Sequence, residues 1–241
     1  MTIAVIIPAR YDSMRFPGKP LAKISGKPMI EWVIDAAIRS KLANKIIVAT
    51  DDKRIDAVSR SKNIEVFLTS NEHKSGTDRI CEAVKKNPEI KYIVNLQGDE
   101  PLMPPEYIDK VIEKLISFQN SLLCIVSLAA PMQTQEELNN PNIVKAVIDR
   151  DGFAVSFTRF PSTMNLDAYY RHIGIYGYSR ETLLLFNSLP QSNLELKEQL
   201  EQLRALENNI KIKLEIVPIA YPAVDKENDV LIVEELLKLQ T

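Results

Sequence analysis

The chain has 241 residues, of which 45% are hydrophobic and 26% charged, enough apolar material for one sizeable core. A net charge of -2 excludes a general polyanion binder, because no surplus of cations exists to neutralise a nucleic-acid backbone. Cys81 and Cys124 lack zinc-knuckle spacing, so we expect both to be reduced and buried, without a structural zinc. The first apolar run stops at Pro8 and no secretory leader precedes it, which favours a cytoplasmic protein that does not enter the membrane.

Short β-branched runs alternate with amphipathic segments through the first half of the chain. Strands are predicted at 3–7, 46–49, 66–68 and 92–96, and helices at 29–38, 55–61, 80–84 and 108–118. Strands separated by helices of this length predict right-handed βαβ crossovers and an α/β fold with a mostly parallel sheet. Ligands of such sheets bind where loops leave the carboxyl ends of the strands.

From Leu122 onward, closely spaced strands predict an antiparallel extension. They are expected at 124–128, 144–148, 153–158 and 171–178, with Asp151-Gly152 as a hairpin turn. Helices follow at 181–187, capped by Ser179, at 194–207 and at 229–239, with a strand at 213–217. We therefore expect one domain over 1–241, with an antiparallel lobe at about 122–178.

A cationic loop follows the first predicted strand. Arg10, Arg15 and Lys19 lie within ten residues, on a segment that also contains Pro17 and Gly18. Three fixed positive charges suit a triphosphate. The segment is neither a P-loop nor a dinucleotide fingerprint, because the glycine spacing of both is absent. The alternative is a solvated basic loop without a ligand.

Two further segments lie at predicted strand ends. The segment 73–79 has hydroxyls and free amides at a helix start near Thr77, which suits an anion or is only a capped helix. Asp99 and Glu100 follow a buried strand, where a carboxylate is a natural Mg²⁺ ligand; the alternative is a helix cap.

Three later features are ambiguous when judged from the residues alone. A lone histidine in a strand, His172, is more often a structural residue than a catalyst. Glu201 and Gln202 fit the polar stripe of an amphipathic helix. Asp225 fits a helix N-cap as well as a second metal ligand.

Five separated motifs together resemble the sugar-acid cytidylyltransferases, and most closely the CMP-KDO synthetase (3-deoxy-manno-octulosonate cytidylyltransferase) family. The first is Pro-Ala-Arg-x-x-Ser-x-Arg-x-Pro-Gly-Lys-Pro-Leu at 8–21. The others are Ser-Gly-Thr-x-Arg at 75–79, Gln-Gly-Asp-x-Pro at 97–101, Arg-His-x-Gly-x-Tyr at 171–176 and Leu-Glu-Gln-Leu-Arg at 200–204. They follow the family order over nearly the whole chain, from Ile7 to Asp225.

The resemblance implies a role for each matching residue. It implies that Arg10, Ser13, Arg15 and Lys19 hold the phosphates of CTP, and that Ser75, Gly76, Thr77 and Arg79 contact the nucleoside. It implies sugar contacts for Gln97, Arg159, His172, Tyr176, Glu201 and Gln202, and a metal site at Asp99 and Asp225, with Glu100 secondary. Arg10, Lys19, Asp99 and Asp225 are accordingly expected to carry the catalysis.

The same resemblance implies a Rossmann-like nucleotidyltransferase fold with helices on both faces of the sheet. It further implies transfer of CMP from CTP to the anomeric hydroxyl of 3-deoxy-D-manno-octulosonate (KDO), with release of pyrophosphate, for lipopolysaccharide synthesis. Mg²⁺ is the implied cofactor, and a homodimer formed through the antiparallel lobe is the implied assembly. Such a transfer depends on positioning and charge neutralisation, and the sequence singles out no general base.

Several alternatives stay open. The segment between Arg159 and Tyr170 is shorter than in many family members, so the acceptor could be the 8-amino analogue of KDO or another ulosonic acid, including a sialic-type acid. A glycosyltransferase would share the parallel sheet, but this chain lacks an Asp-x-Asp motif at the relevant strand end. The family's Val-Asp-Thr-Pro-Glu-Asp reads Val-Asp-Lys-Glu-Asn-Asp at 224–229, a change that motivates a non-catalytic nucleotide-binding module.

Overall fold

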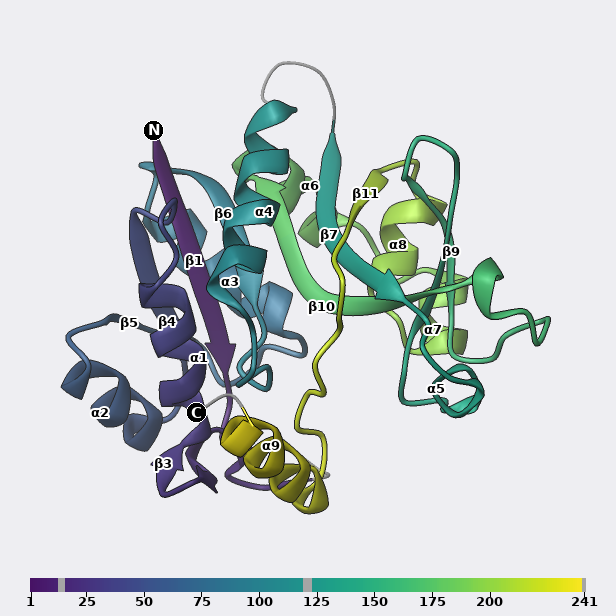
Figure 1. Cartoon of the computed structure of the whole chain (residues 1–241). Coiled ribbons are helices and arrows are strands. Elements are labelled where there is room, and N and C mark those ends of the chain that lie inside the picture. The colour runs from purple at the N-terminus through teal and green to yellow at the C-terminus, as the bar shows by residue number, and fades with distance from the viewer. Residues whose placement is uncertain (13–15, 119–122, 240–241) are drawn as a thin grey trace. The chain divides into compact units, whose positions relative to one another are not determined.

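A computed structural model describes residues 1–12, 16–118 and 123–239 (Figure 1). The predicted phosphate ligands Ser13 and Arg15 lie outside these residues. The chain forms two compact units, one of Met1–Ile112 with Tyr221–Thr241 and one of Glu113–Ala220. None of the helices in the described part of the chain combines the length and apolar character needed to cross a bilayer.

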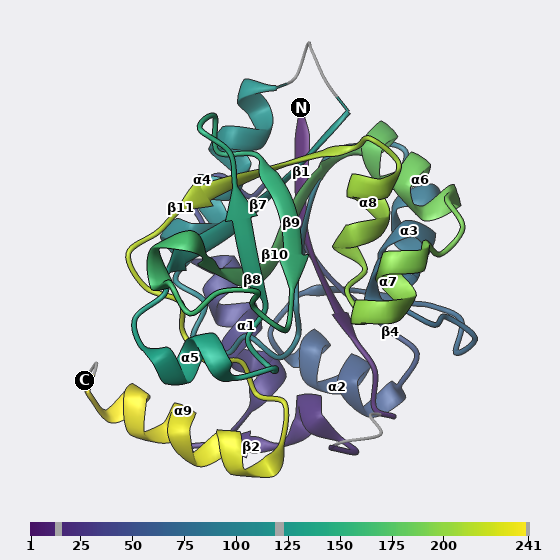
Figure 2. The same cartoon turned by 90° about the vertical axis from the view of Figure 1, so that its right-hand side faces the viewer.

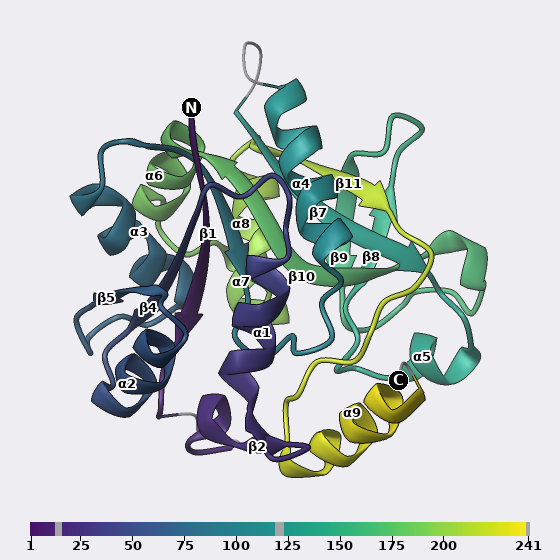
Figure 3. The ribbon, with the colours of Figure 1, turned by 60° about the vertical axis from the view of Figure 1, so that its left-hand side comes forward.

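The first unit is a parallel α/β layer (Figures 1 and 3). Its strands are β1 (Thr2–Ala9), β4 (Lys45–Thr50), β5 (Glu65–Leu68) and β6 (Ile90–Leu96), and its helices are α1 (Met29–Ile38), α2 (Lys53–Ser61), α3 (Gly76–Lys86), the start of α4 (Pro105–Ser117) and α9 (Glu227–Leu239). The strands run in the order β6-β1-β4-β5, and every adjacent pair is parallel. This confirms the predicted parallel sheet.

The strand order of this unit locates its ligand edge. The chain places β4 and β5 on one side of β1 and β6 on the other, so the winding direction reverses at β1. At such a switch point the loops after the two adjoining strands diverge and leave a crevice. Here those loops are the cationic segment that follows Ala9 and the Gln97–Asp99 segment that follows Leu96.

A small apolar cluster fixes the chain around this edge. The short strands β2 (Lys23–Ile24) and β3 (Lys27–Pro28) form a hairpin after the one-turn helix η1 (Lys19–Leu21), and α9 contacts β2 (Figure 3). The buried members of the cluster are Phe16, Ile24, Met29, Leu102, Val224 and Val233. The segments that lead to Lys19, Asp99 and Asp225 therefore share one packed core.

The second unit is mixed and mainly antiparallel (Figure 2). It contains β7 (Cys124–Pro131), α5 (Gln135–Asn139), β8 (Lys145–Ile148), β9 (Ala154–Thr158), η2 (Leu166–Ala168), β10 (Tyr170–Ser179), α6 (Arg180–Ser188), α7 (Asn193–Glu198), α8 (Gln202–Glu207) and β11 (Lys211–Ile216). Strand β10 is antiparallel to β7 and β8, β8 is antiparallel to β9, and β11 is parallel to β7. The predicted antiparallel extension is confirmed, as is Ser179 as the cap of α6.

One sequence prediction is wrong in this unit. The continuous helix expected at 194–207 is two short helices, because Gln199 adopts a left-handed conformation (φ 57°) that ends α7. Tertiary contacts, described below, hold this turn although no glycine or proline marks it. Cys81 and Cys124 are free and buried, as expected.

Candidate active site

The cationic loop begins where the buried strand β1 ends. Arg10, the first residue after the strand, is exposed, so its guanidinium is available to an anion. The Gly18 amide donates to the Tyr11 carbonyl (2.9 Å), which closes the loop onto its own start. Gly18 has φ +72°, and a Cβ at this position would lie 3.0 Å from the Tyr11 ring. The contact between Gly18 and Tyr11 that closes the loop therefore requires a residue without a side chain at position 18.

The contact between Gly18 and Tyr11 gives a testable prediction. Gly18→Ala combines left-handed strain with a clash against Tyr11, so we expect the KM for CTP to rise about 10-fold, equivalent to about 1–2 kcal/mol of lost loop geometry. Gly26→Ala is the matched control, because Gly26 also has positive φ (+81°) but nothing lies within 4 Å of an added Cβ. If steady-state kinetics show equal changes in the KM for CTP for both variants, the contact between Gly18 and Tyr11 has no special role in CTP binding.

Lys19 links two of the sequence motifs to the segment that precedes Asp225. Its ammonium donates to Asp99 Oδ2 (2.7 Å) and to the Val224 carbonyl (2.9 Å). The Val224 amide in turn donates to the Asp99 carbonyl (2.9 Å), so the residue before Asp225 is bonded directly to the Gln97–Asp99 segment. Segments 80 and 205 positions from Lys19 in sequence therefore converge on one cation.

The donor set around Lys19 fits a hard divalent cation. Asp99 and Asp225 lie on hydrogen-bonded segments, and the described part of the chain has no group of three or more His, Cys, Asp or Glu side chains that could hold a metal ion. Mg²⁺ takes one or two carboxylates and completes its coordination with phosphate oxygens and water, so two aspartates are sufficient. Lys19 binds one oxygen of Asp99 and balances its negative charge.

Gly98 lets these segments approach the sheet. A Cβ at Gly98 would lie 2.9 Å from the Pro8 carbonyl oxygen, closer than real Cβ atoms come to neighbouring heavy atoms. The turn after β6 therefore passes tightly against the end of β1 because this residue is glycine. The contact brings the Asp99 segment beside the start of the cationic loop.

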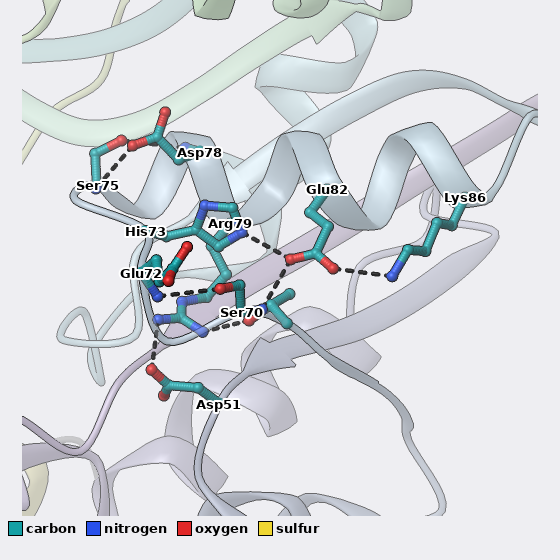
Figure 4. Close-up of polar contacts among 10 residues, drawn as sticks. Asp51, Ser70, Glu72, His73, Ser75, Asp78, Arg79, Glu82 and Lys86 are labelled. Atoms are coloured by element: carbon teal, nitrogen blue, oxygen red, sulfur yellow. Dashed lines mark hydrogen bonds and ion pairs between the residues drawn. The ribbon is translucent and has the colours of Figure 1, made fainter.

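The start of α3 is held by side chains of the helix itself (Figure 4). Ser75 and Asp78 form a capping box, in which Ser75 Oγ accepts from the Asp78 amide (3.1 Å) and Asp78 accepts from the Ser75 amide (3.0 Å). Thr77 is buried, while Ser75 and Gly76 are partly accessible. The capped turn fixes the orientation of the amides that the sequence associates with the nucleoside.

Arg79 supports the loop that precedes α3. Its side chain is 3% exposed, and its guanidinium bonds to Asp51 Oδ2 (2.9 Å) and to the Thr69 hydroxyl (Figure 4). Sequence reasoning missed Asp51, although it lies directly after β4 and so at the ligand edge of the sheet. The structure therefore shows Arg79 as a buried brace between α3 and the ends of two neighbouring strands.

Glu82, one turn further along α3, also binds the preceding loop. It accepts from the Ser70 amide (2.9 Å), from His73 Nε2 (2.7 Å) and from Lys86 (2.9 Å) (Figure 4). Partial burial alone would raise the pKa of Glu82, but the hydrogen bonds from His73, Lys86 and the Ser70 amide together lower it to about 2. Glu82 is therefore ionised at neutral pH and holds the loop from its far side.

The second unit holds the residues that the sequence associates with a sugar acid, apart from Gln97. His172 lies on β10 with its Nε2 2.9 Å from Ser127 Oγ, and its ring packs edge-on against Phe157 and beside Tyr176, 5.5 Å between centroids. Burial lowers the pKa of His172 to about 3, so the ring is neutral at physiological pH. His172 can thus exchange hydrogen bonds with hydroxyl groups but does not supply a positive charge.

The neutral state of His172 predicts a stability change with pH. The unfolded chain takes up a proton at about pH 6.5, whereas folded His172 does not until about pH 3, so stability is lost as pH falls through this window. Between pH 7 and pH 5 the loss from this one group is expected to be about 2 kcal/mol. Urea unfolding of wild type and His172→Gln checks this: the variant should show the shallower pH dependence, and equal slopes would contradict it.

Arg159, Glu201 and Gln202 lie in the same unit. The Arg159 guanidinium bonds to main-chain carbonyls of Pro141, Glu198 and Gln199. Glu201 is the N-cap residue of α8 (Gln202–Glu207) and accepts from Arg204, and Gln202 is 6% exposed. The solvent-facing polar stripe that the isolated pattern suggested is therefore wrong for Gln202, which is buried.

A parallel sheet whose winding reverses at β1, a cationic loop after that strand, and a lysine that ties Asp99 to the main chain next to Asp225 define an α/β protein of the nucleotidyltransferase class. A model of the cytidylyltransferase family matches residues 4–212. The chain is 42% identical to a 3-deoxy-manno-octulosonate cytidylyltransferase of Thermodesulfovibrio yellowstonii, covering 98% of both chains, and 45% identical to one of Leptospira interrogans, covering 97% and 95%. The chain belongs to the 3-deoxy-manno-octulosonate cytidylyltransferase family.

Solved structures agree with this assignment. A CMP:2-keto-3-deoxy-manno-octonic acid synthetase complexed with CTP superposes with a TM-score of 0.92 at 34% identity, covering 100% of both chains. A 4-diphosphocytidyl-2C-methyl-D-erythritol synthase of Anaerococcus prevotii gives a TM-score of 0.67 at 15% identity, which shows a shared fold only. The predicted nucleotidyltransferase fold is thus confirmed.

Proposed function

We propose that the protein transfers CMP from CTP to the anomeric hydroxyl of KDO and releases pyrophosphate. The observation that carries the proposal is the convergence of the cationic loop, Asp99 and the Asp225 segment on Lys19. Family membership supplies the nucleotide and the acceptor, since relatives that match nearly the whole chain are named for this reaction.

The reaction is an in-line attack of the sugar hydroxyl on the α-phosphorus of CTP. Arg10 and Lys19, with Ser13 and Arg15, neutralise and align the triphosphate, and the capped turn at Ser75 orients the nucleoside. Mg²⁺ held by Asp99 and Asp225 would balance charge on the phosphates and polarise the reacting phosphorus. Sugar contacts are proposed for Gln97, Arg159, His172, Tyr176, Glu201 and Gln202. Charge stabilisation and alignment then supply most of the rate enhancement.

The altered turn after Asp225 retains its support. Asp229 accepts hydrogen bonds from the amides of Asp225 and Lys226, 2.8 Å each, and so caps the start of α9. A rigid Thr-Pro pair is not needed where an aspartate fixes the same two amides. This observation favours the enzyme over a binding module that has lost turnover.

Pyrophosphate release with purified protein tests the proposal. We expect turnover with CTP, KDO and Mg²⁺, and a CMP-sugar product by mass spectrometry. Parallel reactions with 8-amino-KDO and N-acetylneuraminate identify the acceptor. Reactions with UTP or ATP in place of CTP test the selectivity for the cytosine base. CTP binding without turnover on any ulosonic acid would favour the binding module instead.

We also propose that the protein is a homodimer formed through the antiparallel lobe. Val155 on β9 and Phe160 just beyond it are 60% and 69% exposed, and β9 pairs along its length only with β8 among the described strands. Light scattering is expected to give twice the chain mass of 27.3 kDa, and Val155→Arg is expected to shift the protein toward a monomer. A wild-type mass near that of one chain at micromolar concentration would contradict this.

The substrates also indicate a cellular setting. CTP is available in the cytoplasm, and a CMP-activated KDO is the form of this sugar that lipopolysaccharide synthesis consumes. We therefore propose a cytoplasmic enzyme that supplies that synthesis.

A further inference from the structure

Lys145 is a buried cation without an acidic partner. Its side chain lies on β8 with 0% exposure, and its ammonium donates to the carbonyls of Asn140 (2.6 Å) and Arg159 (3.0 Å). No carboxylate of the described residues lies within ion-pair distance of it. Burying an ammonium on carbonyl oxygens alone is unfavourable, and burial together with the charge of Arg159 lowers the pKa of Lys145. Lys145 therefore fixes the two main-chain segments whose carbonyls it binds.

Lys145 binds the main chain of Arg159, a second cation whose side chain also binds carbonyl oxygens. Arg159 follows β9 and donates from Nε to the Glu198 carbonyl (3.1 Å), from Nη1 to the Pro141 carbonyl (3.0 Å) and from Nη2 to the Gln199 carbonyl (3.4 Å). Lys145 and Arg159 thus tie the chain at 140–141 and the end of β9 to the turn between α7 and α8. We call these two side chains the carbonyl clamp.

The turn gripped by the clamp is the strained part of this segment. Gln199 has φ 57°, a conformation that costs a non-glycine residue free energy, in a sequence that otherwise favours one continuous helix. The last carbonyls of a helix have no partners within it, and the Arg159 guanidinium binds those of Glu198, which ends α7, and of the C-cap residue Gln199. A buried ion pair between Glu195 and Arg204 (2.8 Å) then fixes α8 against α7.

We propose that Lys145 and Arg159 are positioning residues that hold the Gln199 turn so that Glu201 and Gln202 are set for the sugar acid. Glu201 and Gln202 come two and three positions after the strained residue, so relaxation of the turn into a helix would rotate both away from their present directions. The inference rests on the proposed function for the identity of the ligand, but the turn itself can be tested without any ligand.

The kinetic experiment compares Lys145→Met with Lys197→Met, which removes an exposed lysine from α7. We expect Lys145→Met to raise the KM for KDO at least about 10-fold while the KM for CTP changes less than about 2-fold. Arg159→Lys keeps the positive charge that a direct contact with the sugar acid would use but loses the three carbonyl contacts, so it should show the same split. Because both residues act through one turn, the double variant should be no worse than the more impaired single variant.

Hydrogen exchange supplies the measurement that needs no substrate. Amides at 200–204 should exchange at least about 10-fold faster in Lys145→Met than in wild type or Lys197→Met. Arg159→Lys gives the same readout if Lys145→Met does not fold. Unchanged exchange would overturn the clamp, and so would faster exchange with an unchanged KM for KDO or equal rises in both KM values. If wild type makes no pyrophosphate, the proposed function fails separately, and the exchange rates still decide whether the clamp holds the turn.

Discussion

Asp99→Asn is expected to lower kcat for pyrophosphate release at least about 1,000-fold while leaving the fold intact. The asparagine oxygen can still accept from Lys19, whose ammonium lies 2.7 Å from Asp99 Oδ2, so the packing around the site is preserved. What is lost is the negative charge proposed to bind Mg²⁺, and metal-based charge stabilisation contributes several kcal/mol to transfers of this kind. The measurement is steady-state turnover at saturating CTP and KDO over a Mg²⁺ series.

The matched control is Asp151→Asn, which removes an exposed carboxylate from the β8–β9 hairpin and should leave kcat within about 2-fold. Circular dichroism and thermal unfolding should be alike for both variants. Near-normal turnover of Asp99→Asn at saturating Mg²⁺ would mean that the metal assignment is wrong.

Lys19→Met is expected to reduce kcat/KM for CTP about 100- to 1,000-fold. The substitution removes a cation proposed to bind the triphosphate. It also leaves the Asp99 carboxylate without the ammonium that balances its charge, so this carboxylate repels the incoming triphosphate. The stability loss should be modest, about 1 kcal/mol, because both side chains of the ion pair retain contact with solvent. The effect on activity therefore far exceeds the effect on folding.

Lys23→Met tests whether any cation near the loop would suffice. Lys23 is exposed on β2, four residues from Lys19, and contributes no hydrogen bond to Asp99. We expect near wild-type kinetics from it. A similar loss of activity in both variants would point to general electrostatic attraction of CTP instead of the specific position of Lys19.

Much of the first unit follows from local sequence pattern. Alternating β-branched runs and amphipathic segments predicted all four parallel strands, and the strand-end rule located the cationic loop and Asp99 at one edge. What the pattern did not indicate was the role of Val224, because its contribution to Lys19 is a main-chain carbonyl, which leaves no mark on residue type.

The sequence was less informative where tertiary contacts override local preference. The stretch at 194–207 has helix-favouring residues throughout, yet Gln199 breaks it because Arg159 and the Glu195–Arg204 pair hold the turn. Arg79 shows the same limit: the motif associates it with the nucleotide, whereas its burial and its bond to Asp51 became evident only in three dimensions. Long-range partners of cations cannot be assigned from spacing alone.

A crystal structure with CTP and Mg²⁺ tests the central claim most directly. The account predicts the triphosphate along the loop from Arg10 to Lys19, with one Mg²⁺ bound by Asp99 and Asp225 and the Lys19 ammonium turned toward a phosphate oxygen. A triphosphate bound elsewhere, or a metal ion that contacts neither aspartate, would contradict it.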